Sequence, residues 1–301
     1  MAGGVCKFVP IELDPSGVGS DGSQGKWELD MNKLEAAVTP KTKLMLINTP
    51  HNPTGKVFTL EELQAIAHIL ERHPHVTAVM DEVYEKLVFD GREHIRLASL
   101  PGMWERCLTV SSCGKTFSAT GWKVGWVYGA ADLVKPIVLA NQWIQYCVSA
   151  PTQRALSSIL AQADRPYKPS DEENLEFPSY YAYVCDEYVQ KRNALAQMLR
   201  MGNIHPYMPE GGFFIMADTS KYEVPDEYVQ QPGPNGEVPV TRDWGFARWL
   251  TVEKGITPIP PSAFYTPATK HLAANLARFA FCKKEESLIA AQQRFKHLAQ
   301  N

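Results

Sequence analysis

The sequence predicts an α/β protein with a mostly parallel sheet, and two observations lead to this prediction. First, three apolar segments are too short for typical helices and each runs directly into a polar cluster: Lys43–Asn48, Val76–Met80 and Cys107–Val110. Short apolar runs of this kind are typical of strands buried on both faces of a parallel sheet. Second, a helical pattern separates the first two runs, and strand–helix–strand is the order of a βαβ unit.

The helix between the first two strands has a well-defined start signal. Thr59 and Glu62 form a T-x-x-E capping box ahead of Leu63, Ile66, Ala67 and Leu70. In a capping box the two side chains satisfy each other's backbone N–H groups at the first turn.

The later part of the chain changes in pattern. We expect mostly helical segments over Asp132–Ala163 and Asp171–Leu199, a strand at Phe213–Ala217, an exposed proline-rich loop at Tyr222–Thr241, a helix at Arg242–Glu253, strands at Ile256–Ile259 and Leu276–Phe281, and a closing helix from Lys284. This pattern predicts a large domain over residues 1–170 and a smaller α+β domain over residues 171–301.

Composition excludes several classes of protein. The 301 residues are 45% hydrophobic, and 30 basic against 33 acidic side chains give a net charge of −3, so a basic nucleic-acid binder is not expected. No stretch approaches the roughly 20 apolar residues of a membrane span. Six cysteines without a CxxC pair indicate reduced thiols, and the start of the chain resembles no signal peptide, so we expect a cytoplasmic protein.

The polar clusters after the three strands are the candidate site. They are Thr49–Lys56, Asp81–Tyr84 and Ser111–Lys115. Because ligands of open α/β sheets bind beyond the carboxyl ends of the strands, we expect these clusters to converge on one pocket.

Four other motifs are set aside. Gly17–Gly22 spells GxGxxG, but no apolar helix follows it, so a flexible loop is the better interpretation. Gly55-Lys56 lacks the remainder of a phosphate-binding P-loop. His73 and His75 have no ligand partners at zinc spacing, so no metal site is predicted. Ser112-x-x-Lys115 matches the S-x-x-K of serine-acylating enzymes, but their SDN and KTG elements are missing.

Individually, the residues of the candidate site have two interpretations each. Lys115 at a strand end is a candidate amine nucleophile, or a solvated loop lysine. Asp81 could keep the ring nitrogen of a cofactor protonated, or cap a helix. Tyr84 could reach the same pocket, or fill the core.

Together, these strings resemble the pyridoxal-phosphate (PLP) aminotransferases of fold type I. The resemblance rests on Asn52-Pro53-Thr54-Gly55, Asp81-Glu82-Val83-Tyr84, Ser112-x-x-Lys115 and Gly121-Trp122-Lys123-Val124-Gly125. Longer strings, which include Ala98–Arg106 and Lys115–Trp126, are similar to the kynurenine–oxoglutarate transaminase subgroup, also called glutamine transaminase K or cysteine-conjugate β-lyase.

The resemblance implies a role for each matched residue around the cofactor. Lys115 matches the lysine that forms the Schiff base and then moves a proton at the substrate's Cα. Asp81 matches the carboxylate that pairs with the pyridinium nitrogen, which keeps the ring an electron sink. Tyr84 and Asn52 match the groups that hydrogen-bond the cofactor's phenolic oxygen.

Three further residues match phosphate and substrate contacts. Ser112 and Lys123 match ligands of the cofactor phosphate. Arg278 matches the arginine that binds the substrate's α-carboxylate through two parallel hydrogen bonds, and Asn52 matches a second residue on the substrate side. From the residue alone, an exposed arginine on a strand is the simpler interpretation of Arg278.

The implied activity is ping-pong transamination between an amino acid and a 2-oxo acid, in a homodimer. The donors implied are kynurenine and other aromatic, glutamine-like or sulfur-containing amino acids, and β-elimination on cysteine conjugates is a possible side activity of the same residues. No nucleic-acid or membrane partner is expected.

Two departures from the family lead to an alternative. We expect an N-terminal segment of the large domain to be missing, together with a phosphate-binding helix start, a ring-stacking aromatic residue and any mitochondrial targeting segment. Gln145–Pro151 also differs from the subgroup, so specificity there is left unassigned. The alternative is a truncated, catalytically silent homologue that acts at most as a dimerisation partner, and weak cofactor binding is expected in either case.

Overall fold

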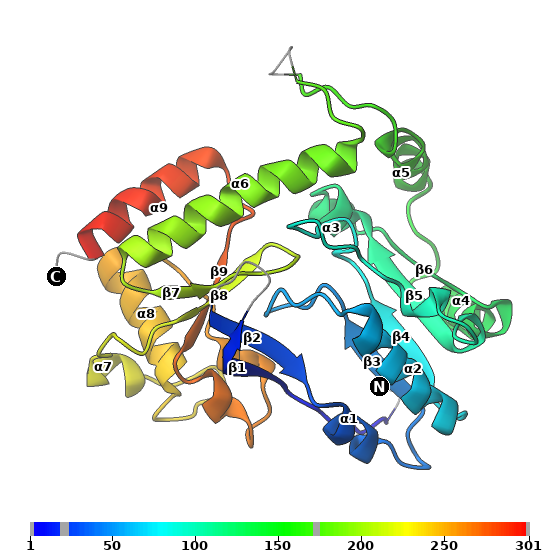
Figure 1. The fold of residues 1–301 in the computed structure, drawn as a ribbon, viewed down its shortest axis with the longest axis horizontal. Helices are drawn as coiled ribbons and strands as arrows, with labels where there is room; N and C mark the ends of the chain where they lie inside the picture. Colours follow the sequence, from blue (N-terminus) through cyan, green and yellow to red (C-terminus); the bar gives the residue numbers. More distant parts are fainter. Residues whose placement is uncertain (1–2, 19–23, 171–174, 299–301) are drawn as a thin grey trace. The chain divides into compact units, whose positions relative to one another are not determined.

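The computed structural model describes residues 3–18, 24–170 and 175–298 (Figure 1). The chain divides into two compact units. The Lys115 unit comprises Val38–His51 and Lys56–Glu187, and the Arg278 unit comprises Met1–Ala37, Asn52–Gly55 and Tyr188–Asn301. The division into residues 1–170 and 171–301 stays a prediction.

A four-stranded sheet forms the centre of the Lys115 unit. Its strands are β3 (Leu44–Asn48), β4 (Thr77–Asp81), β5 (Cys107–Ser112) and β6 (Gly125–Gly129), hydrogen-bonded in that order. The first three strands run parallel and β6 is antiparallel to β5. The predicted α/β class is confirmed, and the three predicted strands form with their carboxyl ends at one edge.

Helix α2 (Leu60–Arg72) connects β3 to β4, as predicted. The Thr59 hydroxyl accepts from the N–H of Glu62, and the Glu62 carboxylate accepts from the N–H of Thr59. Leu63, Ile66 and Leu70 are completely buried, because their spacing places them on one face of the helix.

The first long helical prediction is interrupted in the structure. The segment Asp132–Ala163 is mostly helical, as predicted, and consists of helix α4 (Ala131–Ile144) and helix α5 (Ala150–Ala163). Tyr146 has a left-handed backbone, with φ at 65°, which a continuing right-handed helix does not allow. Pro151 then lies at the first turn of α5, where a missing N–H costs nothing.

The second long helix begins later than predicted. Helix α6 runs over Tyr180–Met201, whereas the predicted segment started at Asp171, and residues 171–174 lie outside the described part. Phe177 instead forms a β-bridge with Tyr167, and Pro178 disfavours a helical conformation for the residue before it.

The Arg278 unit contains two antiparallel sheets. A hairpin pairs β1 (Ile11–Val18) with β2 (Gln24–Leu29), and the second sheet has the order β7 (His205–Tyr207), β8 (Phe214–Asp218), β9 (Leu276–Ala280). The helices wholly within the unit are α1 (Met31–Ala37), α7 (Asp226–Val229), α8 (Arg242–Lys254) and α9 (Glu285–Leu298), and α6 belongs to it from Tyr188 on. Antiparallel strands with helices match the expected α+β character. The loop predicted at Gly17–Gly22 falls mainly on residues 19–23, outside the described part.

The strand predicted at Ile256–Ile259 is wrong. Only a single bridge forms there, between Ile259 and Arg278 of β9. Pro258 and Pro260 flank that bridge, and because proline has no N–H it cannot continue a ladder.

Short 3-10 helices complete the fold: η1 (Leu97–Ser99), η2 (Trp104–Arg106), η3 (Thr120–Trp122), η4 (Pro261–Phe264) and η5 (Lys270–Ala273). Within the described residues, no helix combines the length and the apolar composition needed to cross a membrane.

Candidate active site

The carboxyl end of β4 presents Asp81. Its backbone is fixed by the neighbouring strand end, because the Asn48 side-chain amide donates to the carbonyl of Asp81 at 2.9 Å and the N–H of Thr49 donates to it at 3.0 Å. On the other side, the N–H of Glu82 donates to the carbonyl of Val110 in β5 at 2.9 Å. The sheet therefore fixes the backbone from which the Asp81 carboxylate projects.

The Asp81 carboxylate lies in a partly buried, electrostatically mixed environment. Burial raises its pKa above the ordinary value of 3.8, while the N–H of Val83, at 3.3 Å from Oδ1, and the positive charge of Lys115 act in the opposite direction. A half-buried carboxylate of this kind is stabilised by a nearby cation. Asp81 can therefore bind a cationic N–H group of a ligand.

Lys115 lies on α3 (Cys113–Thr116), a single turn that follows β5 directly. Cys113 anchors the turn in an apolar cluster with Val124 and Leu156, and Ser112 caps it by accepting from the N–H of Gly114 at 3.1 Å. Lys115 Nζ lies 5.9 Å from the centre of the ring of Tyr84, which is 3% exposed. The amine thus lies near one carboxylate and one phenol.

The two predicted phosphate ligands lie close to α3 in the chain. Ser112 pairs with Gly125 of β6, and the N–H of Cys113 donates to the carbonyl of Val124 at 3.2 Å. Lys123 is exposed, with a left-handed backbone at φ 55°. A hydroxyl and an ammonium group are donors suited to a phosphate, and the assignment of this role stays a prediction.

Arg278 and Asn52 belong to the other unit and contact each other there. Arg278 NH1 donates to Oδ1 of Asn52 at 2.7 Å, and the guanidinium group lies 4.0 Å from the ring centre of Phe214 and 4.9 Å from that of Phe264. Both rings lie within cation–π distance of the guanidinium group, whose planar fork is suited to a carboxylate.

The Asn52-Pro53-Thr54-Gly55 segment is held within the Arg278 unit by its glycine. The carbonyl of Gly55 accepts from the N–H groups of Glu210 and Gly211, both at 2.9 Å. Gly55 has φ at 73°, and a Cβ there would lie 2.3 Å from Cβ of Pro209, so only glycine fits without displacement.

The structure therefore gives two groups of candidate residues, each within its own unit. Asp81, Tyr84, Ser112, Lys115 and Lys123 belong to the Lys115 unit, and Asn52 and Arg278 belong to the Arg278 unit. Across residues 3–18, 24–170 and 175–298, no three His, Cys, Asp or Glu side chains gather as a metal site.

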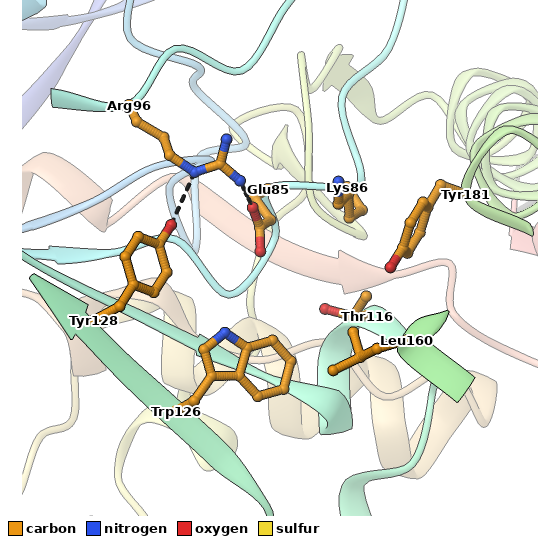
Figure 2. A pocket seen from close by; sticks show the side chains of 8 residues that line it. All are labelled: Glu85, Lys86, Arg96, Thr116, Trp126, Tyr128, Leu160 and Tyr181. Carbon is orange, nitrogen blue, oxygen red and sulfur yellow. Dashed lines mark hydrogen bonds and ion pairs between the residues drawn. The ribbon is translucent and has the colours of Figure 1, made fainter. Parts of the chain in front are cut away.

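The sequence prediction did not identify a polar network directly behind Asp81. Glu82 is fully buried and its carboxylate lies 2.8 Å from Nε2 of His94 and 3.5 Å from Nε of Arg96. Arg96 also pairs with Glu85 and donates to the Tyr128 hydroxyl at 2.9 Å (Figure 2). These contacts depend on side chains from separate segments, for which the sequence contains no spacing signal.

Comparison with known proteins identifies the class of protein. Residues 5–292 match the profile of the family described as aminotransferase class I and II. The chain therefore belongs to the class I and II aminotransferases, a family whose members are in general PLP-dependent.

Individual relatives are similar over almost the whole chain. It is 41% identical over 293 residues to a kynurenine–oxoglutarate transaminase of Dictyostelium discoideum. The alignment covers 96% of this chain and 65% of the relative. It is 36% identical to the human kynurenine–oxoglutarate transaminase 1, and that alignment covers 98% of this chain and 67% of the relative. The chain thus spans about two thirds of the length of these relatives.

Solved structures agree on the fold. Bna3p of Saccharomyces cerevisiae superposes with a TM-score of 0.83 at 32% identity, over 98% of this chain and 66% of that chain. The N-succinyldiaminopimelate aminotransferase of Mycobacterium tuberculosis superposes with a TM-score of 0.77 at 34% identity, over 95% of this chain and 64% of that chain. The chain has the type I fold of PLP-dependent aminotransferases, as predicted.

Proposed function

We propose that this chain is a PLP-dependent aminotransferase that exchanges the amino group of an amino acid with a 2-oxo acid. The observation that carries the proposal is that Asp81 at the end of β4 lies near Lys115, which follows β5. There a half-buried carboxylate lies within the electrostatic influence of an amine. The alternative of a silent homologue is not favoured, since relatives at 41% and 36% identity carry the name of a transaminase.

The residues of the Lys115 unit fit the cofactor chemically. Lys115 supplies the amine that binds its aldehyde, and Asp81, whose pKa burial raises, gains a cationic partner in the ring nitrogen. Tyr84 supplies a phenol beside the amine. Ser112 and Lys123 supply a hydroxyl and a cation for the phosphate.

Bound PLP supplies an electron sink for the charge that develops at the substrate's Cα. Lys115, once its amine is free, takes the proton from Cα as a general base. Asp81 stays anionic and keeps a proton on the ring nitrogen. Arg278 binds the α-carboxylate, and Asn52 holds one guanidinium nitrogen of Arg278 in position.

The proposed donors follow the relatives and the longer sequence strings. Two similar relatives carry the name kynurenine–oxoglutarate transaminase. We therefore propose kynurenine and other aromatic, glutamine-like or sulfur-containing amino acids as donors, with β-elimination on cysteine conjugates as a side reaction of the same residues.

The test is product formation from kynurenine and 2-oxoglutarate with added PLP. We expect glutamate in proportion to enzyme, and complete loss with Lys115→Ala. The matched control is Lys135→Ala, an exposed lysine of α4, which should retain the activity. Absence of glutamate with a panel of such donors, or retention of activity in Lys115→Ala, would overturn the proposal.

A further inference from the structure

A pocket of about 330 Å³ lies in the Lys115 unit beside α3 (Figure 2). Its lining residues come from six segments of that unit: Glu85, Lys86, Arg96, Thr116, Trp126, Tyr128, Leu160 and Tyr181. The candidate catalytic residues Asp81 and Lys115 do not line it. The volume lies at the lower end of the range for ligand pockets, which indicates a small ligand.

On one side of the pocket, the charged side chains pair with one another. Arg96 pairs with Glu85 and lies 3.5 Å from the Glu82 carboxylate, and the Ser111 hydroxyl donates to Glu85 Oε1 at 3.0 Å. These contacts engage the one guanidinium group with two carboxylates. This side therefore offers no unpaired cation to a ligand.

Lys86, which follows Glu85 in the chain, supplies an ammonium group to the pocket. Lys86 Nζ lies 4.4 Å from the ring centre of Tyr181, and within the described chain no carboxylate pairs with it. Burial, with the charges of Asp164 and Glu85, raises the pKa of Tyr181 to about 12, so its phenol stays protonated and can donate. Lys86 and Tyr181 thus offer a cation and a hydroxyl donor side by side.

Thr116 adds a third donor from the floor of the pocket. The side chain is 4% exposed, and its buried hydroxyl has no hydrogen-bond partner among the described residues. Figure 2 shows the hydroxyl oxygens of Thr116 and Tyr181 directed toward the space that the labelled side chains enclose. A buried hydroxyl without a partner is costly, and a ligand oxygen would relieve that cost.

We propose that this pocket binds a small monocarboxylate with a flat apolar body. The carboxylate would accept from Lys86, Tyr181 and Thr116, and the apolar body would pack between Trp126 and Leu160. Charge-assisted bonds from an ammonium group favour a carboxylate over a neutral amide. The inference does not rest on the proposed function, because the pocket residues are different.

Benzoate is the probe, with benzamide as the uncharged analogue. The protein is labelled with 5-fluorotryptophan, and the ¹⁹F resonance of Trp126, one of seven tryptophans, is assigned with Trp126→Phe. We expect benzoate to shift this resonance saturably, with a Kd of about 1 mM. Benzamide should leave it unshifted at the same concentrations.

Two variants test the donors, with circular dichroism as the check on folding. Lys86→Met should weaken benzoate binding about tenfold and Thr116→Val about threefold. Lys254→Met is the matched control, because this lysine also lies over an aromatic ring, that of Trp249 at 5.9 Å, but away from the pocket.

Three results would overturn the proposal. They are an unshifted Trp126 resonance, an unchanged Kd in Lys86→Met, and loss of the Trp126 shift in Arg278→Met, which would mean that benzoate acts from the proposed substrate site. Failure of transamination with intact benzoate binding would leave the pocket proposal standing, so the two proposals fail separately.

Discussion

Asp81 is a proposed catalytic residue whose partly buried carboxylate lowers the stability of the folded chain. Burial raises the pKa of the Asp81 carboxyl group above 3.8 in the folded chain. The folded state therefore binds a proton more readily than the unfolded state, and the stability contribution of this group decreases as the pH rises from 3.8 through the folded pKa.

Asp81→Asn should accordingly raise the melting temperature of the cofactor-free protein at pH 7, since the amide oxygen still accepts from Val83. The gain should vanish well below pH 3.8, where the carboxyl group is protonated in both the folded and the unfolded state. Thermal unfolding across that pH range measures it, and Asp132→Asn, at an exposed position of α4, should give no gain. A lower melting temperature for Asp81→Asn at pH 7 would contradict this account.

Arg278 is the second residue for which the structure predicts a clear effect of substitution. Its guanidinium group lies over the rings of Phe214 and Phe264 and donates to Asn52. Lysine keeps the charge but loses the fork and the stacking, so Arg278→Lys should raise KM for the amino acid and the 2-oxo acid by about 30-fold or more. Steady-state kinetics measures it, and Arg248→Lys, an arginine bound to backbone carbonyls, is the control that should leave KM unchanged. Equal KM values for Arg278→Lys and the wild type would rule out a carboxylate contact.

At the scale of the element, local signals predicted α2 well. Thr59→Ala removes the side-chain acceptor of the capping box and should destabilise the protein by about 1 kcal/mol in urea unfolding. Ser149→Ala is the matched control, because Ser149 stands at the N-cap of α5 without a side-chain cap bond and should change stability by less than about 0.5 kcal/mol. Similar losses in both variants would mean that the cap bond adds nothing.

Elsewhere, local signals were insufficient. Strands β3, β4 and β5 were predictable because their sequences are continuously apolar. The expected burial on both faces is wrong for β3, since Leu44 and Leu46 are 61% and 72% exposed in the described chain. Strand β6 was missed because Gly125 and Gly129 bound a short run and its pairing with β5 depends on tertiary contacts. The predicted strand at Ile256–Ile259 failed because its prolines lack the donors that a ladder needs.

The candidate site shows the same contrast. Lys115 and Asp81 follow strands that adjoin in a parallel sheet, so their proximity followed from topology. The contact between Arg278 and Asn52 joins residues 226 positions apart, and only the family resemblance indicated it. The pocket beside Thr116 had no signal, since its lining side chains are scattered over six segments.

At the scale of the whole molecule, we expect self-association, because class I and II aminotransferases are generally dimeric. Exposed apolar side chains gather along α4, with Trp143 91% and Ile144 84% exposed in the single chain. Faces of this kind mark interaction surfaces. Trp143→Glu should therefore shift the chain toward monomer in light scattering, whereas Val252→Glu, at an exposed apolar position on α8, should not. A wild-type monomer at micromolar concentration would exclude this interface.

The central claim is that Lys115 binds PLP covalently at a site formed with Asp81. An absorbance titration of the chain with PLP tests it most directly. We predict a saturable, red-shifted band at one cofactor per chain for the wild type and for Lys135→Ala, and no such band for Lys115→Ala. Absence of the band in the wild type, or its persistence in Lys115→Ala, would contradict the claim.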